Sequence, residues 1–150
     1  MVAKPLRIKL NWLEPEQVAQ AIVEQWGEAG LIWLDGDGTK LGQWVTIAGN
    51  PVDEVCCRGL PSSENKSNPF EVLKHLKPGN WTGWLSYEAG AWVEPNNPWK
   101  EDAMATLWIA SHDPIFKFDL INHQLFIEGC DKQRIRKMVN WVNKIMTKNN

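Results

Sequence analysis

Short apolar runs separated by turn-forming residues constrain this 150-residue chain more than any other feature of its sequence. Breaks such as Asp35-Gly36-Asp37-Gly38 and Gly49-Asn50-Pro51 contain residues that favour turns. Runs of this length, bounded by such breaks, are typical of β-strands. The sequence therefore predicts about seven strands, at 31–34, 44–48, 52–57, 81–87, 105–110, 115–118 and 124–128, and residues 6–10 alternate well enough for one more.

Helical periodicity is confined to three places. Residues 15–26 carry apolar side chains at positions 18, 22 and 26, and Pro15 suits a first helical turn. A second helix is expected to begin at Asn68-Pro69, to bury Phe70, Leu73 and Leu76, and to end at Pro78-Gly79. A third helix is expected from Asp131, as its cap, to residue 146, with its apolar stripe at positions 135, 138, 139, 142 and 145.

The order of these elements predicts an α+β fold. Segments 115–118 and 124–128 lie close enough in the sequence to form a hairpin, which favours antiparallel pairing. The break at Gly49-Asn50-Pro51 predicts a second hairpin between 44–48 and 52–57. We therefore expect antiparallel β-sheets with about three helices packed outside, in a single domain over 1–150.

Composition narrows the functional classes. The net charge is −2, and no basic stripe or polybasic cluster indicates nucleic acid or an anionic membrane. The N-terminus carries no signal-like apolar segment, and the three cysteines are an odd number, so a reduced, cytoplasmic protein is expected. Ten tryptophans stand against one tyrosine. We expect most of them to fill a core, and the alternative is that a few line a pocket for a flat ligand.

No residue pattern indicates a complete catalytic set. The Asp-Gly-Asp-Gly break lacks both a phosphate-loop signature and the glutamate of a calcium loop, because residue 46 is threonine. The three histidines lack metal-ligand spacing, and the cysteines are expected to be small apolar fillers. Glu88 and Glu94 are the best candidates for acid–base work, and turn capping or surface pairing is the alternative. The residues alone favour a binding or supporting module.

Five segments of the chain, at 33–36, 41–51, 68–73, 83–95 and 111–123, contain recognisable motifs. In this order they resemble component I of aminodeoxychorismate synthase and of anthranilate synthase. Trp33-Leu34-Asp35-Gly36 is similar to the family's strand ending in Leu-Asp/Glu-Ser, and residues 41–51 (LGQWVTIAGNP) resemble its Gly-Arg-Tyr/Trp-Ser-Ile stretch. Residues 83–88 (GWLSYE), continuing to Glu94-Pro95, resemble Gly-Tyr-Leu-Ser-Tyr-Asp followed by Glu-x-Pro. Asn68-Pro69 and the 111–123 segment also sit where the family has a helix start and a hairpin, so the resemblance spans about residues 12–147.

This resemblance implies a non-catalytic N-terminal domain that packs against a larger chorismate-binding domain. That catalytic domain, with its magnesium-binding glutamates, is absent from this sequence, so the resemblance assigns no catalytic residue, metal or cofactor to the chain. The implied partners are a chorismate-binding domain or chain and a glutamine amidotransferase subunit. The form Trp33-Leu34-Asp35 favours the para-aminobenzoate branch, which leads to folate, over the anthranilate branch, which leads to tryptophan.

The resemblance also implies part of a tryptophan-binding pocket. By motif position its residues would be Leu34, Asp35, Gly36, Gln43, Trp44 and Val45. Gly36 replaces the family's serine and Trp44-Val45 replaces Tyr-Ser, so we expect weak or no tryptophan binding by this chain alone. Two rival hypotheses are a free-standing sensor of aromatic amino acids and a small hydrolase with a Cys–His pair that uses His75, His112 or His123.

Overall fold

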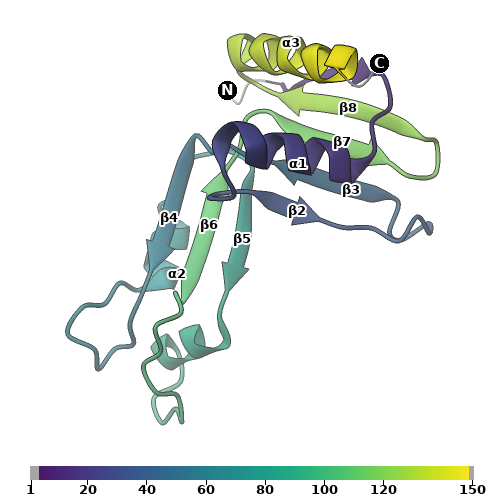
Figure 1. Cartoon of the computed structure of the whole chain (residues 1–150). Coiled ribbons are helices and arrows are strands. Elements are labelled where there is room, and N and C mark those ends of the chain that lie inside the picture. Colours follow the sequence, from purple (N-terminus) through teal and green to yellow (C-terminus); the bar gives the residue numbers. More distant parts are fainter. Residues whose placement is uncertain (1–3, 149–150) are drawn as a thin grey trace. The chain divides into compact units, whose positions relative to one another are not determined.

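The computed structural model describes residues 4–148, which form eight strands, three α-helices and one 3-10 helix (Figure 1). The elements follow the order β1 (Leu6–Leu10), α1 (Pro15–Trp26), β2 (Ile32–Leu34), β3 (Trp44–Ala48), β4 (Asp53–Cys57), α2 (Pro69–Lys74), β5 (Trp81–Leu85), η1 (Tyr87–Trp92), β6 (Leu107–Ser111), β7 (Ile115–Asp119), β8 (Gln124–Gly129) and α3 (Lys132–Lys148). The predicted α+β class is confirmed.

The chain divides into two compact units, which we describe separately. Unit 1 comprises residues 1–52 and 112–150, and unit 2 comprises Asp53–Ser111. Unit 1 is thus assembled from two separate stretches of sequence. The expectation that residues 1–150 form a single domain stays a prediction.

Unit 1 contains an antiparallel sheet in the order β1-β8-β7-β3-β2. The predicted 115–118/124–128 hairpin is confirmed, because β7 pairs with β8 in antiparallel register. One transverse row joins Ile8, Ile127, Phe116 and Ile47, and the neighbouring row joins Lys9, Phe126, Lys117 and Thr46. Because side chains alternate across a strand, the first row points to one face of the sheet and the second row to the other.

Helices α1 and α3 cover one face of this sheet, which we call the inner face (Figure 1). Val18 and Ile22 of α1 and Ile135, Met138 and Val142 of α3 are buried there against Val45, Ile47, Phe116, Phe118, Leu125 and Ile127. Trp26 and Val139 of the predicted stripes also pack against this core, whereas at the end of α3 Met146 takes the place predicted for Ile145. The opposite face of the sheet, which we call the outer face, carries the Lys9–Thr46 row.

Local signals fix the two helix starts in unit 1. Pro15 occupies the first turn of α1, and the Gln17 side chain accepts a hydrogen bond from the Glu14 backbone N–H at 3.0 Å. Asp131 caps α3 as predicted, since its Oδ1 accepts from the backbone N–H groups of Gln133 and Arg134. These bonds satisfy N–H groups that have no partner within the helix.

Unit 2 contains an antiparallel sheet in the order β4-β6-β5, with the six-residue helix α2. Asn68 caps α2 as predicted, accepting from the Phe70 N–H at 3.0 Å. Val72 and Leu76 pack against the buried cluster of Cys57, Leu107 and Ile109. Leu73, which the sequence placed on the buried face, is exposed, and Val72 packs against the sheet instead. Helix α2 ends at Lys74, before the predicted end at Pro78-Gly79.

The predicted hairpin between 44–48 and 52–57 is wrong. Strand β3 pairs with β2 and β7, whereas β4 pairs with β6 in the other sheet. Contacts within unit 1 hold the intervening turn: Asn50 has a positive φ of 52° and its carbonyl accepts from Arg134, and Gly30 lies directly against Pro51. The chain does turn at Gly49-Asn50-Pro51 as predicted, but this turn connects strands of two different sheets rather than two paired strands.

Candidate functional site

The segment 34–36 ends β2 and turns sharply toward β3. Asp35 is exposed, and its Oδ1 accepts a 3.4 Å hydrogen bond from the Trp33 indole N–H. A Cβ at Gly36 would lie 2.4 Å from the Gly42 carbonyl oxygen and 2.8 Å from that of Trp44. Both contacts are to backbone, so the serine that the related motif carries has no room here without a backbone shift.

The loop after Gly36 is closed by its own polar groups. The Asp37 carboxylate accepts from the Thr39 N–H, and the Thr39 hydroxyl accepts from the Gly42 N–H. The hydrogen bond between the Asp37 and Thr39 side chains is the main reason that the pKa of Asp37 lies below its ordinary value. Asp37 and Thr39 thus hold the turn itself, in line with the turn chemistry predicted for the Asp-Gly-Asp-Gly break.

Gln43 is joined to Asp119, a residue that the sequence placed only in a turn. The Gln43 side-chain amide donates to Asp119 Oδ1 at 3.0 Å, and the Gln43 carbonyl accepts from the Leu120 N–H. Asp119 also accepts from the Asn122 side chain at 2.8 Å and from the backbone N–H groups of Ile121 and Asn122. The Asn122 side chain is the first cause of the lowered pKa of Asp119, followed by its backbone N–H. This network ties β3 to the β7–β8 turn.

Trp44 and Val45 point to opposite faces of the sheet. Val45 belongs to the buried core on the inner face, so it does not border a site on the other side. Trp44 is 37% exposed on the outer face. The Arg7 guanidinium and the Lys117 ammonium each lie 5.7 Å from its ring centroid, and the Phe126 ring lies at 6.4 Å. Cations at this distance are attracted to the face of an indole.

The sequence did not predict that Arg7, Lys117 and Phe126 surround Trp44. Arg7 also lies 5.1 Å from the Phe126 ring and forms a 2.7 Å ion pair with Glu128. Strand alternation places Arg7, Lys117 and Phe126 on one face, but that signal appears only once the pairing of β1, β8, β7 and β3 is known. The structure therefore brings Trp44 and Leu34 to the outer face with three neighbours that the motif did not include.

The six residues predicted for a tryptophan pocket border no described cavity. Leu34 is 51% exposed on the outer face, where it pairs with Thr46. Five cavities in residues 4–148 are lined by side chains other than these six. Around Trp44 the outer face carries partly exposed apolar groups and the cations of Arg7 and Lys117.

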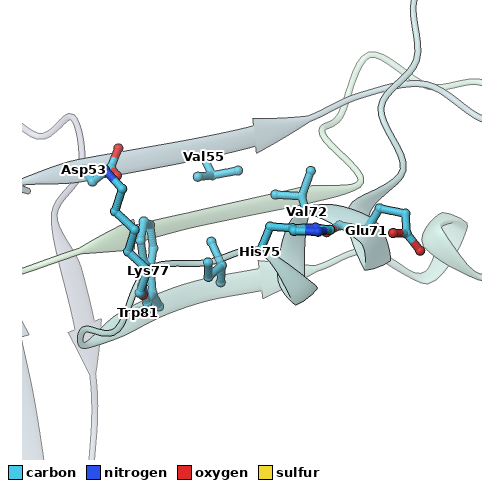
Figure 2. Close-up of a pocket in the computed structure, with 8 residues that line it drawn as sticks. Asp53, Val55, Glu71, Val72, His75, Lys77 and Trp81 are labelled. Carbon is cyan, nitrogen blue, oxygen red and sulfur yellow. The ribbon is translucent and has the colours of Figure 1, made fainter. Parts of the chain in front are cut away.

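A groove of about 410 Å³ lies in unit 2 between α2, β4 and Trp81 (Figure 2). Figure 2 shows Asp53 and Lys77 at one end and Glu71 and His75 at the other, with Val55 and Val72 between them. At the end of the groove near α2, the side chains of His75 and Glu71 already have partners from α2 itself. His75 Nδ1 lies 2.7 Å from the Glu71 carbonyl oxygen, and the Lys74 ammonium, 2.6 Å from the Glu71 carboxylate, is the main cause of that carboxylate's lowered pKa.

The histidines of the Cys–His hypothesis have defined neighbours. His112 is buried with Nε2 at 2.7 Å from the Gly30 carbonyl oxygen, and His123 stacks on Trp12 with ring centroids 3.9 Å apart. Cys57 is a buried apolar filler as predicted, whereas Cys56 and Cys130 are exposed. In residues 4–148 no group of three or more His, Cys, Asp or Glu side chains is placed to hold a metal ion.

Comparison with other proteins adds no assignment: no protein-family model and no curated sequence matches this chain. Across the described residues, no helix has the length and apolar character needed to cross a bilayer.

Proposed function

We propose that this chain is a non-catalytic, supporting or regulatory N-terminal domain of an aminodeoxychorismate synthase component I. It would act in the formation of para-aminobenzoate from chorismate, on the way to folate. The proposal rests on the motif resemblance and on one structural observation. The sheet of unit 1 is packed by helices on its inner face, while its outer face exposes apolar side chains.

The outer face has the character of a docking surface. Leu34 and Trp44 are 51% and 37% exposed there, and Phe126 is half-buried beside them. Burying apolar surface stabilises an interface by roughly 25 cal/mol per Å² before the cost of association. Contiguous exposed apolar groups on a folded protein often mark interaction sites.

Unit 2 exposes a second apolar set. Tyr87, Val93 and Met104 are 81%, 62% and 57% exposed, and Trp84 and Leu85 of β5 are 37% and 46% exposed. Trp84, Leu85 and Tyr87 belong to the segment that resembles the family's Gly-Tyr-Leu-Ser-Tyr-Asp motif. A partner that packs on one face of β5 and on the start of η1 would cover Tyr87 and one of Trp84 and Leu85, because neighbouring side chains of a strand point to opposite faces.

In this proposal the chain performs no bond-making step. A chorismate-binding domain or chain would hold magnesium and deliver ammonia to the ring, and a glutamine amidotransferase subunit would supply that ammonia. This chain would stabilise or regulate that partner by covering part of its surface. The anthranilate branch is the alternative, and the product of the assembled enzyme distinguishes the two branches.

The test is association with a chorismate-binding catalytic chain, with matched surface variants. Leu34→Asp places a charge on the outer face, and Ile121→Asp does the same in the β7–β8 turn at the same exposure of 51%. We expect co-purification and stimulated aminodeoxychorismate formation with the original chain and with Ile121→Asp, and loss of both with Leu34→Asp.

Three outcomes would overturn the proposal. They are equal binding by the two variants, no binding by the original chain, and turnover of chorismate by this chain alone with magnesium and ammonia. Tight, stoichiometric binding of tryptophan in a calorimetric titration would instead favour the free-standing sensor.

A further inference from the structure

A cavity of about 230 Å³ in unit 1 combines two cations with apolar walls. It lies where the end of α1, the turn after β3, the start of β7 and the first turns of α3 meet. Its lining residues are Trp26, Asn50, Pro114, Arg134, Lys137 and Met138. The volume is smaller than the roughly 300–1,000 Å³ of pockets for drug-sized ligands. It is several times the roughly 30 Å³ that one water molecule occupies in the liquid.

Arg134 is held in place by backbone groups rather than by an acid. Its Nε donates to the Asp113 carbonyl oxygen, and its Nη2 donates to the Asn50 carbonyl oxygen at 2.9 Å. A guanidinium has five N–H groups, so these two bonds leave donors available. Because the half-buried side chain is already ordered, binding an anion would cost little further conformational entropy.

The charges that line the cavity are both positive. Lys137 follows Arg134 by three positions on α3, which places the two side chains on the same side of the helix. No aspartate or glutamate is among the lining residues. The acids nearby in the sequence bind backbone N–H groups at the start of α3. The Asp113 carboxylate accepts from the backbone N–H groups of Cys130 and Asp131, and the Asp131 carboxylate accepts from the backbone N–H groups of Gln133 and Arg134.

Besides these two cations and Asn50, the cavity is lined by the apolar residues Trp26, Pro114 and Met138. Trp26 is half-buried, and its ring centroid lies 4.7 Å from that of Trp141. Pro114 and Met138 are buried beneath the cavity. An indole ring and a thioether favour contact with a flat apolar group.

We propose that this cavity binds a small carboxylate that carries a flat apolar body. The carboxylate would accept from the guanidinium of Arg134 and from the ammonium of Lys137, and the apolar body would lie against Trp26 and Met138. Charge-assisted bonds between a guanidinium and a carboxylate give both strength and orientation. The proposal does not depend on the function proposed above, because it uses residues that the exposed docking surfaces do not include.

The experiment uses benzoate as the probe and benzamide as its uncharged match. Binding is followed by calorimetry and by the indole N–H signals of the tryptophans in two-dimensional NMR. We expect benzoate to bind one site, to shift the Trp26 signal, and to bind at least about tenfold more tightly than benzamide, as a charge-assisted hydrogen bond predicts.

Variants locate the site. Lys137→Gln is expected to weaken benzoate binding about fivefold, whereas Lys144→Gln, an exposed control on the same helix, leaves it unchanged. Both residues are exposed, so neither change threatens the fold. Equal binding of benzamide, equal effects of the two variants, or no saturable benzoate binding would refute the proposal. Phosphate binding as tight as that of benzoate would refute the part assigned to the flat body.

Discussion

Gly49 and Ile22 test how closely α1 packs on the inner face of the sheet. A Cβ at Gly49 would lie 2.2 Å from Ile22 Cγ2, and Ile22 is fully buried with 0% exposure. Gly49 is not among the glycines with a positive φ, so the backbone itself tolerates alanine. The cost of Gly49→Ala therefore comes from this contact.

The magnitudes follow from packing. Overpacking by one methyl group costs about 1–3 kcal/mol of the free energy of unfolding, and removing a buried isoleucine side chain to alanine costs about 2–5 kcal/mol. In the double variant Gly49→Ala/Ile22→Ala the new methyl group occupies space that Ile22 Cγ2 has left. We therefore expect the double variant to be more stable than the sum of the two changes predicts, by about 0.5–3 kcal/mol.

The measurement is urea unfolding followed by tryptophan fluorescence for the four proteins of this cycle. Ile135→Ala, which removes an equally buried side chain from α3, replaces Ile22→Ala in a control cycle. The three atoms nearest to a Cβ at position 49 all belong to Ile22, so the effects of Ile135→Ala and Gly49→Ala are expected to be closer to additive. Additivity in both cycles would refute the packing of α1 described above.

Three further predictions use the same assay. Gly36→Ser is expected to destabilise by about 1–3 kcal/mol, since its Cβ would meet the Gly42 and Trp44 carbonyl oxygens; an unchanged midpoint would contradict this. Asp119→Asn is expected to lower stability at pH 7. The pKa of Asp119 is lower in the folded protein than in the unfolded chain, where it is near 3.8. The ionised Asp119 carboxylate therefore stabilises the fold fully above the unfolded pKa, and this contribution is lost as the pH falls through the folded pKa. The difference in unfolding free energy between the original protein and Asp119→Asn should therefore shrink in acid. Asp131→Ala is expected to cost about 0.5–2 kcal/mol through loss of the α3 cap, and Asp131→Asn should retain most of that stability.

Local signals in the sequence were sufficient for most elements of the fold. Pro15, Asn68 and Asp131 mark helix starts that the structure confirms, and the hairpin of β7 and β8 follows from its short connection. The pairing of β3 and β4 was not predictable in this way. A turn at Gly49-Asn50-Pro51 indicates that the chain changes direction, but it does not name the partners of the two strands. Strand β3 pairs with the preceding β2 and with β7, and β4 pairs with β6, both far along the chain.

The neighbours of Trp44 were also not predictable from local sequence. The motif grouped Leu34, Trp44 and Val45 in one pocket, but alternation along β3 sends Val45 to the core and Trp44 to the other face. Arg7, Lys117 and Phe126 come from three other strands, and only the sheet order makes them neighbours of Trp44. The position of Arg134 in the cavity near Trp26 depends likewise on the backbone carbonyls of residues 50 and 113.

The pairing of β1 with β8 has a consequence for synthesis. Leu6 lies opposite Gly129, so the first strand has no partner in its sheet until the last strand has been made. At roughly 5–20 residues per second, a ribosome needs on the order of 6–25 s to produce the intervening chain. During that interval Leu6, Ile8 and Leu10 belong to an unpaired segment that chaperones can hold, and slowing elongation beyond β7 would lengthen their exposure.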